Sequence, residues 1–194
     1  MIAIQDVAKS TSEVAIASLK ARGLKTVMLT GDNERVAQAV ADQVGIDEVI
    51  ADVLPGDKAE HVHAFQKAGK VAFVGDGIND APALTTADVG IAMGSGTDIA
   101  IDAGGIVLVK NDLRDVDRAL ALSKKTFNRI KLNLFWAFVY NVLGIPVAAG
   151  LFFAIGLTLS PELAGLAMAF SSLSVVTSSV LLNKAKISSN AQPA

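Results

Sequence analysis

The sequence contains no cysteine, and few of its residues carry a charge. Because none of the 194 residues is Cys, disulfides and thiolate metal sites within the chain are excluded. Charged residues make up 19% and the formal net charge is −2, without a basic stripe, so a nucleic-acid partner is not expected. Lys9 and Glu13 interrupt any apolar segment near the start, so no signal peptide is visible. The 52% hydrophobic content and a mean hydropathy of +0.47 favour a chain that lies partly in a lipid bilayer.

Two long runs in the second half of the chain have no charged residue. Residues 132–159 and 163–183 lack Asp, Glu, Lys and Arg. A helix needs about 20 apolar residues to cross the hydrocarbon core of a bilayer. Each run therefore predicts a transmembrane helix, and two buried helices of a soluble domain are the alternative.

The basic residues that flank these runs predict their orientation. The turn at 160–162 has no Lys or Arg, whereas basic residues precede the first run and follow the second: Lys124, Lys125, Arg129, Lys131, Lys184 and Lys186. We therefore expect a linking helix at 113–131, an extracytoplasmic turn at 160–162 and a cytoplasmic tail at 184–194. Both termini would be cytoplasmic.

Residues 1–112 show the pattern of an α/β domain. Apolar segments near 26–30, 49–52, 71–75, 89–93 and 106–109 alternate with helical segments, the first of them around 6–21. This order is typical of a parallel sheet with helices on both faces. Such sheets place their chemistry at the carboxyl ends of the strands.

The most informative run is Gly75-Asp76-Gly77-Ile78-Asn79-Asp80-Ala81-Pro82-Ala83-Leu84. Its glycines allow a tight turn from a buried strand into a helix that we expect to start near Asp80. Mg²⁺ prefers hard oxygen ligands and usually takes one or two protein carboxylates, which suits Asp76 with Asp80. The run therefore indicates phosphoryl chemistry, although many non-catalytic α/β proteins share a strand, a Gly-Asp-Gly turn and a helix.

Two further motifs indicate phosphate binding. Thr30-Gly31-Asp32-Asn33 follows a predicted strand, so a hydroxyl and turn amides are placed to bind phosphate oxygens while Asp32 or Asn33 caps the next helix. Pro55-Gly56-Asp57-Lys58 opens another helix, and the helix dipole disfavours a cation in the first turn. We infer that Lys58 serves a phosphate.

Together these motifs resemble those of the haloacid dehalogenase-like superfamily, and more narrowly the phosphorylation domain of a P-type ATPase. The resemblance extends from about Ile4 to about Lys186. It implies an incomplete haloacid dehalogenase-like Rossmannoid domain with a parallel sheet, followed by a two-helix transmembrane hairpin. The catalytic residues that the resemblance implies are Thr30, Gly31 and Asp32 in one loop, with Lys58, Asp76, Asn79 and Asp80. By the same resemblance, Thr30 and Lys58 bind phosphoryl oxygens, Asp76 ligates Mg²⁺, and Asn79 with Asp80 completes the metal and phosphate shell.

The nucleophile of that family is missing. Its Asp-Lys-Thr-Gly-Thr motif, which supplies the phosphorylated aspartate, does not occur between Met1 and Ala194, and the nucleotide-binding insertion is absent too. In the superfamily the nucleophile lies on the central strand, so its absence leaves a gap in the sheet. We therefore expect the carboxyl-terminal portion of a larger pump, which alone does not turn over ATP. The alternatives are a separately expressed, inactive membrane protein that binds copper or regulates a pump, and a membrane-tethered phosphatase.

Polar residues within the two apolar runs suggest the cargo. Tyr140-Asn141 in the first run and Met168 with Ser171-Ser172 in the second resemble copper-transporting heavy-metal P-type ATPases. Thioether sulfur suits Cu(I), or equally Ag(I), and a charge-free site disfavours Zn²⁺. The Cys-Pro-Cys motif of the family is absent, so any ion site here is partial. Pro146 is expected to kink the first helix near mid-membrane.

Overall fold

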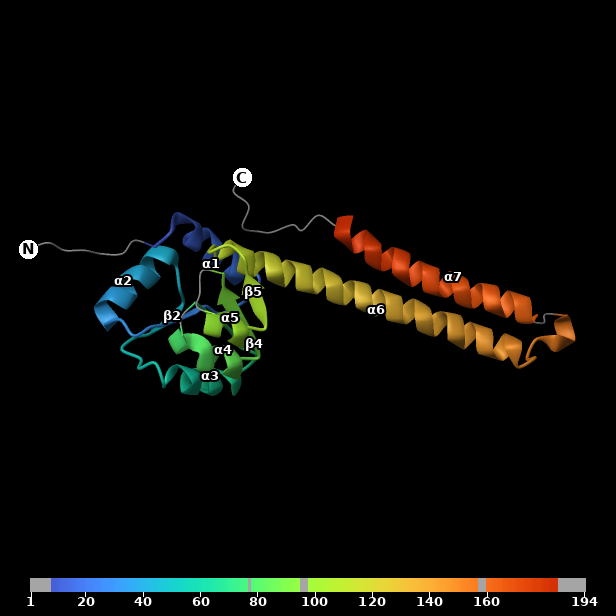
Figure 1. Cartoon of the computed structure of the whole chain (residues 1–194), viewed down its shortest axis with the longest axis horizontal. Coiled ribbons are helices and arrows are strands. Elements are labelled where there is room, and N and C mark those ends of the chain that lie inside the picture. The colour runs from blue at the N-terminus through green and yellow to red at the C-terminus, as the bar shows by residue number, and fades with distance from the viewer. Residues whose placement is uncertain (1–7, 77, 95–97, 157–159, 185–194) are drawn as a thin grey trace, which may run out of the picture. The chain divides into compact units, whose positions relative to one another are not determined.

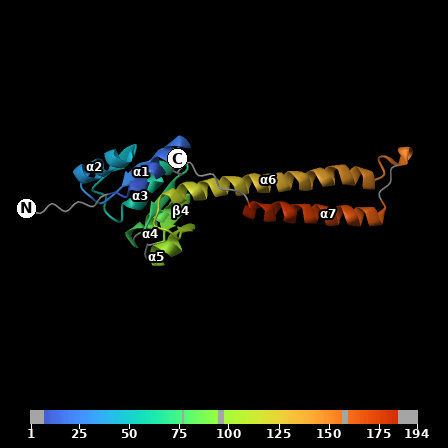
Figure 2. The same ribbon diagram turned by 90° about the horizontal axis from the view of Figure 1, so that it is seen from above.

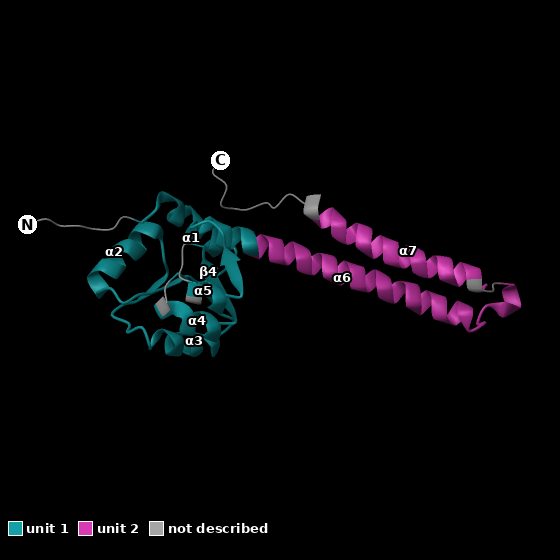
Figure 3. Ribbon diagram, viewed as in Figure 1, with its two compact units in different colours: residues 1–119, 189–194 teal, residues 120–188 magenta. Residues whose placement is uncertain are grey.

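The computed structural model describes residues 8–76, 78–94, 98–156 and 160–184, and they divide into two compact units (Figure 3). The first unit contains residues up to 119, and the second residues 120–188. Residues 185–194 of the predicted tail, and the start of the helix expected from residue 6, lie outside the described residues.

The first unit is an α/β domain, as the alternating sequence pattern predicts. All of its strand pairs are parallel. Its elements in order are α1 (Ser10–Ala21), β1 (Val27–Leu29), α2 (Glu34–Val44), β2 (Glu48–Ile50), α3 (Lys58–Gln66), β3 (Ala72–Gly75), η1 (Ile78–Asp80), α4 (Ala81–Thr86), β4 (Val89–Met93), α5 (Asp98–Ala103) and β5 (Ile106–Leu108) (Figure 1). Each strand lies within the segment predicted for it or starts at most one residue before it.

The strands form two separate sheets. β1 pairs with β2, with Met28 opposite Val49, and the second sheet has the order β3-β4-β5. In that sheet Val74 lies opposite Ile91, and Ile91 opposite Ile106. Among the described residues no ladder joins β1 to β3, which agrees with the gap expected for a domain without its central strand.

The core of the larger sheet lies around β4. Ile91 and Ala92 are almost completely buried, and so are Leu84 and Ala83 of the adjacent α4. Complete burial of a Leu or Ile side chain stabilises the fold by about 1.5–3 kcal/mol. This packing fixes α4, and with it the turn that follows β3.

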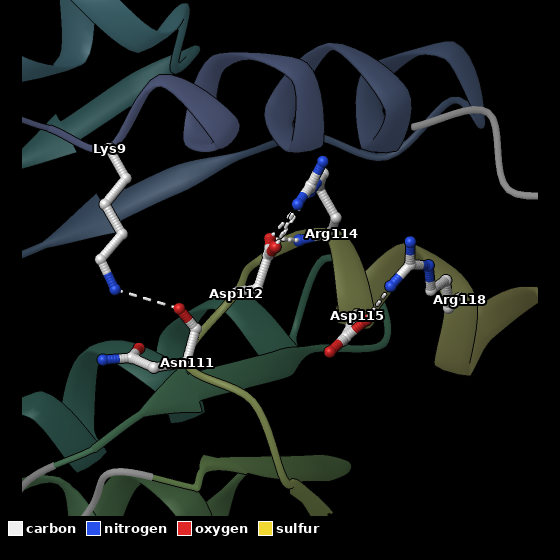
Figure 4. A network of polar contacts seen from close by, with 6 residues as sticks. All are labelled: Lys9, Asn111, Asp112, Arg114, Asp115 and Arg118. Carbon is white, nitrogen blue, oxygen red and sulfur yellow. Dashed lines mark hydrogen bonds and ion pairs between the residues drawn. The ribbon is translucent and has the colours of Figure 1, made fainter. Parts of the chain in front are cut away.

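A polar network fixes the segment that leads into the long helix α6 (Arg114–Ala148) (Figure 4). The Asp112 carboxylate accepts hydrogen bonds from the Arg114 backbone N–H at 2.9 Å and from its guanidinium at 2.6 Å. The Arg114 guanidinium lowers the pKa of Asp112. The Lys9 ammonium donates to the Asn111 carbonyl at 3.0 Å. The start of α6 is therefore tied to the segment before α1.

A second contact to the base of α6 is an ion pair between Arg22 and Asp117. Arg22 follows the last residue of α1, and its guanidinium donates to Asp117, whose side chain is 0% exposed. Replacing Arg22 by Met removes this cation from the buried carboxylate. We expect the free energy of unfolding to fall by about 3–5 kcal/mol, measured by urea denaturation of the chain in non-ionic detergent.

The matched control is the exposed pair Arg118–Asp115, whose atoms are 2.6 Å apart. Arg118→Met removes the same kind of side chain from a surface pair and should cost no more than about 1 kcal/mol. The double variant Arg22→Met/Asp117→Asn should recover part of the loss, since it removes the buried charge. Equal costs for Arg22→Met and Arg118→Met would contradict a special role for the buried pair.

Two carboxylates connect neighbouring elements of the first unit. Asp88, before β4, pairs with Lys70 at 2.6 Å and accepts from the Val71 N–H at 3.0 Å. Asp47, before β2, pairs with Lys20 at 2.6 Å and accepts from the Thr26 N–H at 2.9 Å. The hydrogen bonds from their lysines, then those from the backbone, lower the pKa of each carboxyl to about 2.

These two groups should make the domain less stable in acid. An unfolded Asp has a pKa near 3.8, so their contribution is complete above about pH 4 and is lost as the pH falls through about 2. We expect the urea midpoint, followed by circular dichroism, to fall across this window. Asp47→Asn/Asp88→Asn should lower the midpoint at neutral pH and flatten its acid dependence. Asp102→Asn, at an exposed residue of α5, is the control that should follow the parent chain.

The second unit is a helical hairpin. α6 continues without a break through the boundary predicted at 131, and α7 (Pro161–Val180) runs antiparallel beside it in both views (Figures 1 and 2). Arg129 donates to Ser178 Oγ and Asn133 to Ser179 Oγ, each at 3.1 Å. The short helices η2 (Phe153–Ile155) and η3 (Leu181–Lys184) follow α6 and α7. Both long helices have the length and apolar composition needed to cross a membrane.

Pro146 does not lie in the middle of a helix, so the mid-helix kink expected there is wrong. It lies in the last turn of α6, which ends at Ala148. Proline lacks the N–H that continues a helix, and the left-handed Gly150, with φ +81°, turns the chain away just afterwards. Pro146 therefore marks the end of α6, and the apolar run extends beyond this helix into η2.

Candidate functional site

The turn after β3 holds the two carboxylates that the sequence singles out. Asp76 directly follows β3 and is exposed, whereas Asp80 ends η1 and is 8% exposed. The backbone N–H of Asp76 donates to Asp80 Oδ2 at 3.3 Å. The turn thus folds the two aspartates back toward one another, while the intervening Asn79 is exposed.

Lys58 reaches this turn from another element. Its ammonium lies 2.6 Å from Asp80 Oδ1, and only 17% of the lysine side chain and 12% of the aspartate side chain are exposed. Lys58 is the first residue of α3, where the helix dipole does not favour a cation. The ion pair supplies the missing stabilisation. Since an ammonium has three donors, the pair leaves Lys58 capacity to bind a phosphoryl oxygen as well.

Gly75 has a role that the sequence pattern does not reveal. A Cβ built at this position would lie 2.8 Å from both the Cβ and Oδ2 of Asp80. Only glycine at the end of β3 leaves room for the Asp80 carboxylate. Gly75 lies five residues before Asp80, and this spacing could have indicated the close approach. A glycine at the end of a strand, however, usually indicates only a turn.

The second phosphate motif follows β1. Thr30 Oγ1 donates to Asp32 Oδ2 at 2.9 Å and accepts from the Asp32 N–H at 3.1 Å. Asn33 Oδ1 accepts from the Val36 N–H at 3.0 Å and caps α2, as one of the two predicted caps. Gly31 is exposed, and a Cβ there would lie 3.2 Å from the Val53 carbonyl. The loop is compact, with the Thr30 hydroxyl held at its centre.

The chain connects the two motifs through the segment after β2. The Asp52 N–H donates to the Asp32 carbonyl at 2.9 Å, and the Val53 N–H to the Thr30 carbonyl at 3.0 Å. Asp52 has φ 54°, a left-handed conformation that is uncommon for a residue other than glycine. Val53 is five residues before Lys58, a span of at most about 17 Å. The Thr30 loop and the Lys58–Asp80 pair therefore belong to one region of the first unit.

The carboxylates at this site suit Mg²⁺ only if other groups supply the rest of its ligands. Among the described residues, no group of three His, Asp or Glu side chains is placed to hold a metal ion. Magnesium commonly takes one or two carboxylates and completes its shell with water and substrate phosphate. An exposed Asp76 beside a charge-paired Asp80 fits that pattern.

The residues proposed for copper lie at the same level of the hairpin. Tyr140 is seven residues after Asn133, and Ser172 is seven before Ser179, the partner of Asn133. Because both helices rise equally per residue, Tyr140-Asn141 and Met168 to Ser172 come to the same depth.

The polar contacts that the structure gives these residues remain within their own helices. Asn141 donates to the Ala137 carbonyl at 2.8 Å, and Ser172 to that of Met168 at 3.2 Å. The Met168 side chain is 76% exposed. Tyr140 and Ser171 are likewise not buried within the chain. The hairpin aligns the predicted ligands without closing a site around an ion.

Two kinds of comparison match the first unit. Two family models, both described as haloacid dehalogenase-like hydrolase, match residues 1–88 and 57–120. The catalytic domain of the CPx-ATPase CopB-B is 37% identical, with a TM-score of 0.52 over 56% of this chain and 44% of that one. Both comparisons agree with the parallel α/β architecture.

Longer relatives match both units. A probable copper-transporting ATPase, PacS, from Synechocystis is 56% identical over 95% of this chain, and a probable copper-exporting P-type ATPase from Archaeoglobus fulgidus is 54% identical over 94%. The chain spans 25% and 23% of these relatives, and 12% of the human copper-transporting ATPase 2, to which it is 51% identical. A zinc-transporting PIB-type ATPase in the E2.Pi state has a TM-score of 0.82 at 36% identity, over 92% of this chain and 28% of that one.

Proposed function

We propose that this chain, a member of the heavy-metal P-type ATPases that matches their carboxyl-terminal portion, works as part of an ATP-driven Cu(I) exporter. The observation that carries the proposal is the Lys58–Asp80 pair beside Asp76, at the carboxyl end of β3 in a haloacid dehalogenase-like domain. The chain spans a quarter or less of the copper-transporting relatives described above. The phosphorylated aspartate and the nucleotide site would therefore come from polypeptide outside these residues.

In this proposal the residues of the first unit position and neutralise a phosphoryl group. Mg²⁺, bound by Asp76 and supported by Asp80, supplies charge neutralisation at the phosphoryl oxygens. Lys58 binds one such oxygen through a donor that Asp80 does not use, and Asp80 keeps its ammonium in place. The Thr30 hydroxyl, which donates its single proton to Asp32 in this structure, would turn that proton to another phosphoryl oxygen. Asn79 is exposed in the same turn and completes the shell.

In the second unit, Tyr140, Asn141, Met168, Ser171 and Ser172 would supply part of a Cu(I) site. A soft thioether and neutral oxygens suit a soft monovalent ion, and Ag(I) has similar ligand demands. The absence of charged residues in the two runs favours Cu(I) over Zn²⁺ as the transported ion. The chain is also 51–56% identical to named copper transporters but 36% identical to the zinc-transporting structure. The remaining ligands would come from other helices of the pump.

The copper dependence of ATP hydrolysis tests which ion the pump transports. Met168→Leu keeps the side-chain volume but removes the sulfur, so a complete pump that contains this sequence should lose most of its copper-stimulated ATP hydrolysis. Ser174→Ala, on the same helix, is the control, because Ser174 is not a predicted ligand and its hydroxyl donates to the Ser171 carbonyl at 2.8 Å. Full copper stimulation in the Met168→Leu pump would remove Met168 from the ligand set.

The size of the native polypeptide tests whether the chain works within a pump. An antibody against residues 187–194 should detect, in membranes of the source cells, a band several times heavier than 20.0 kDa. A band near that mass would instead favour the separately expressed protein that binds copper or regulates a pump.

We also propose that both ends of the hairpin face the cytoplasm. Basic residues of α6 precede its charge-free part, and Lys184 follows α7, which supports this orientation. Protease digestion of sealed vesicles of known orientation tests it, because cleavage of the first unit and of the tail should occur from the same side.

A further inference from the structure

A cavity at one end of the hairpin is not used by the proposed pump chemistry. It is lined by Lys125, Asn128, Arg129 and Leu132 of α6 and by Leu182 of η3, and its volume is about 390 Å³. Pockets of about 300–1,000 Å³ commonly hold small ligands. Every lining residue belongs to the second unit.

The lining is polar at one end and apolar at the other. The four α6 residues follow the spacing i, i+3, i+4 and i+7, so they form one stripe along a single helix face. Lys125 starts the stripe and Leu132 ends it, at the first residue of the charge-free run 132–159. Leu182 adds a second apolar wall. A ligand with an anionic head and an apolar tail matches this order.

Arg129 is held in a fixed position at the cavity. Its guanidinium donates to Ser178 Oγ of α7 at 3.1 Å, and the side chain is partly buried. A guanidinium has five N–H donors in a planar fork that matches phosphate oxygens, and this bond uses only one. Lys125, one helical turn earlier, adds a second positive charge, and Asn128 adds an amide donor.

We propose that this cavity binds the phosphate headgroup of an anionic phospholipid, with Arg129 and Lys125 on the phosphate and the two leucines against the start of the acyl chains. The proposal rests on the hairpin crossing a bilayer, as the proposed function requires. Basic pockets at the cytoplasmic ends of transmembrane helices are suited to such headgroups. A soluble phosphate satisfies the cations but makes no use of Leu132 and Leu182, which is why the lipid is the favoured occupant.

The single tryptophan, Trp136, provides a reporter one helical turn beyond Leu132. The full chain is reconstituted in phosphatidylcholine vesicles with a rising fraction of either brominated phosphatidylglycerol or brominated phosphatidylcholine, and quenching of Trp136 gives relative binding constants. We expect phosphatidylglycerol to bind at least about fivefold more tightly than phosphatidylcholine, since one cation near the membrane surface contributes about that factor. Lys125→Gln/Arg129→Gln should reduce this preference to about one.

Two further variants distinguish lipid binding in the cavity from a general effect of positive charge and from an effect of helix packing. Lys124→Gln/Lys131→Gln removes the same charge from exposed residues of α6 that do not line the cavity, and it should retain most of the preference. Ser178→Ala removes the Arg129 contact with α7 but keeps the charge, and should also retain it. Equal losses in the two double variants, or no preference in the parent chain, would overturn the lipid site.

The remaining outcomes distinguish the ligand source and the membrane proposal. Loss of the preference in millimolar inorganic phosphate would identify a soluble-anion site and overturn the lipid assignment. Quenching by brominated phosphatidylcholine without any preference overturns the lipid site alone and leaves the membrane hairpin standing. No quenching by either brominated lipid would overturn both.

Discussion

Lys58→Gln is expected to reduce ATP hydrolysis by a complete pump that contains this sequence by about 100-fold or more. The variant removes the cation that lies 2.6 Å from Asp80 and that we place on a phosphoryl oxygen. Loss of one preorganised donor to a developing charge costs about 10²–10³ in rate. The measurement is kcat for copper-stimulated ATP hydrolysis at saturating ATP and Mg²⁺.

Lys67→Gln is the matched control on the same helix. Lys67 follows the last residue of α3 and is exposed, so its replacement should leave kcat unchanged within about twofold. Lys58→Gln also removes one hydrogen-bond partner from the mostly buried Asp80 carboxylate, which costs about 1–3 kcal/mol of stability.

The double variant Lys58→Gln/Asp80→Asn removes that buried charge and separates the two effects. It should regain stability without regaining activity. A stable but fully active Lys58→Gln pump would exclude Lys58 from the phosphate site.

Gly90→Ala is expected to cause a large loss of stability in the first unit. Gly90 lies in β4, and a Cβ there would be 2.3 Å from the Leu84 carbonyl oxygen and 3.0 Å from its carbon. These are backbone atoms at the end of α4, so no side-chain rotation can relieve the clash. We expect the free energy of unfolding to fall by about 3 kcal/mol or more, measured by urea denaturation in non-ionic detergent.

Gly69→Ala tests whether loss of a glycine is itself harmful. A Cβ at Gly69 meets no atom within 4 Å, and its φ is not in the left-handed region. Its replacement should change stability by no more than about 1 kcal/mol, because it also restricts the unfolded chain. Similar losses in the two variants would show that close packing of β4 against α4 is not what Gly90 provides.

The position of Gly90 also links this packing to the candidate site. Phe73 of β3 lies opposite Gly90 in the parallel ladder, and Asp76 follows β3 directly. A displacement of β4 or α4 would therefore move the turn that holds Asp76 and Asp80. We expect Gly90→Ala to weaken the site even though it touches none of its residues.

The sequence alone determined the order of elements and the identity of the candidate residues. Strand positions follow from apolar runs, and the candidate phosphate motifs follow from Thr30-Gly31-Asp32 and from the run after Gly75. The two candidate membrane helices follow from two charge-free stretches. These features are local, because hydrophobic periodicity and turn chemistry act over a few residues. The resemblance to P-type ATPases also rests on contiguous motifs.

Tertiary structure alone decided which distant residues meet. The pairing of Lys58 with Asp80, the burial of Asp117 against Arg22 and the room that Gly75 leaves for a carboxylate depend on contacts between separate elements. The sequence pattern also wrongly placed Pro146 at a mid-helix kink, because where a helix ends depends on the following turn, here the left-handed Gly150. Side-chain packing and ion pairing act through space, so their partners cannot be read from spacing along the chain.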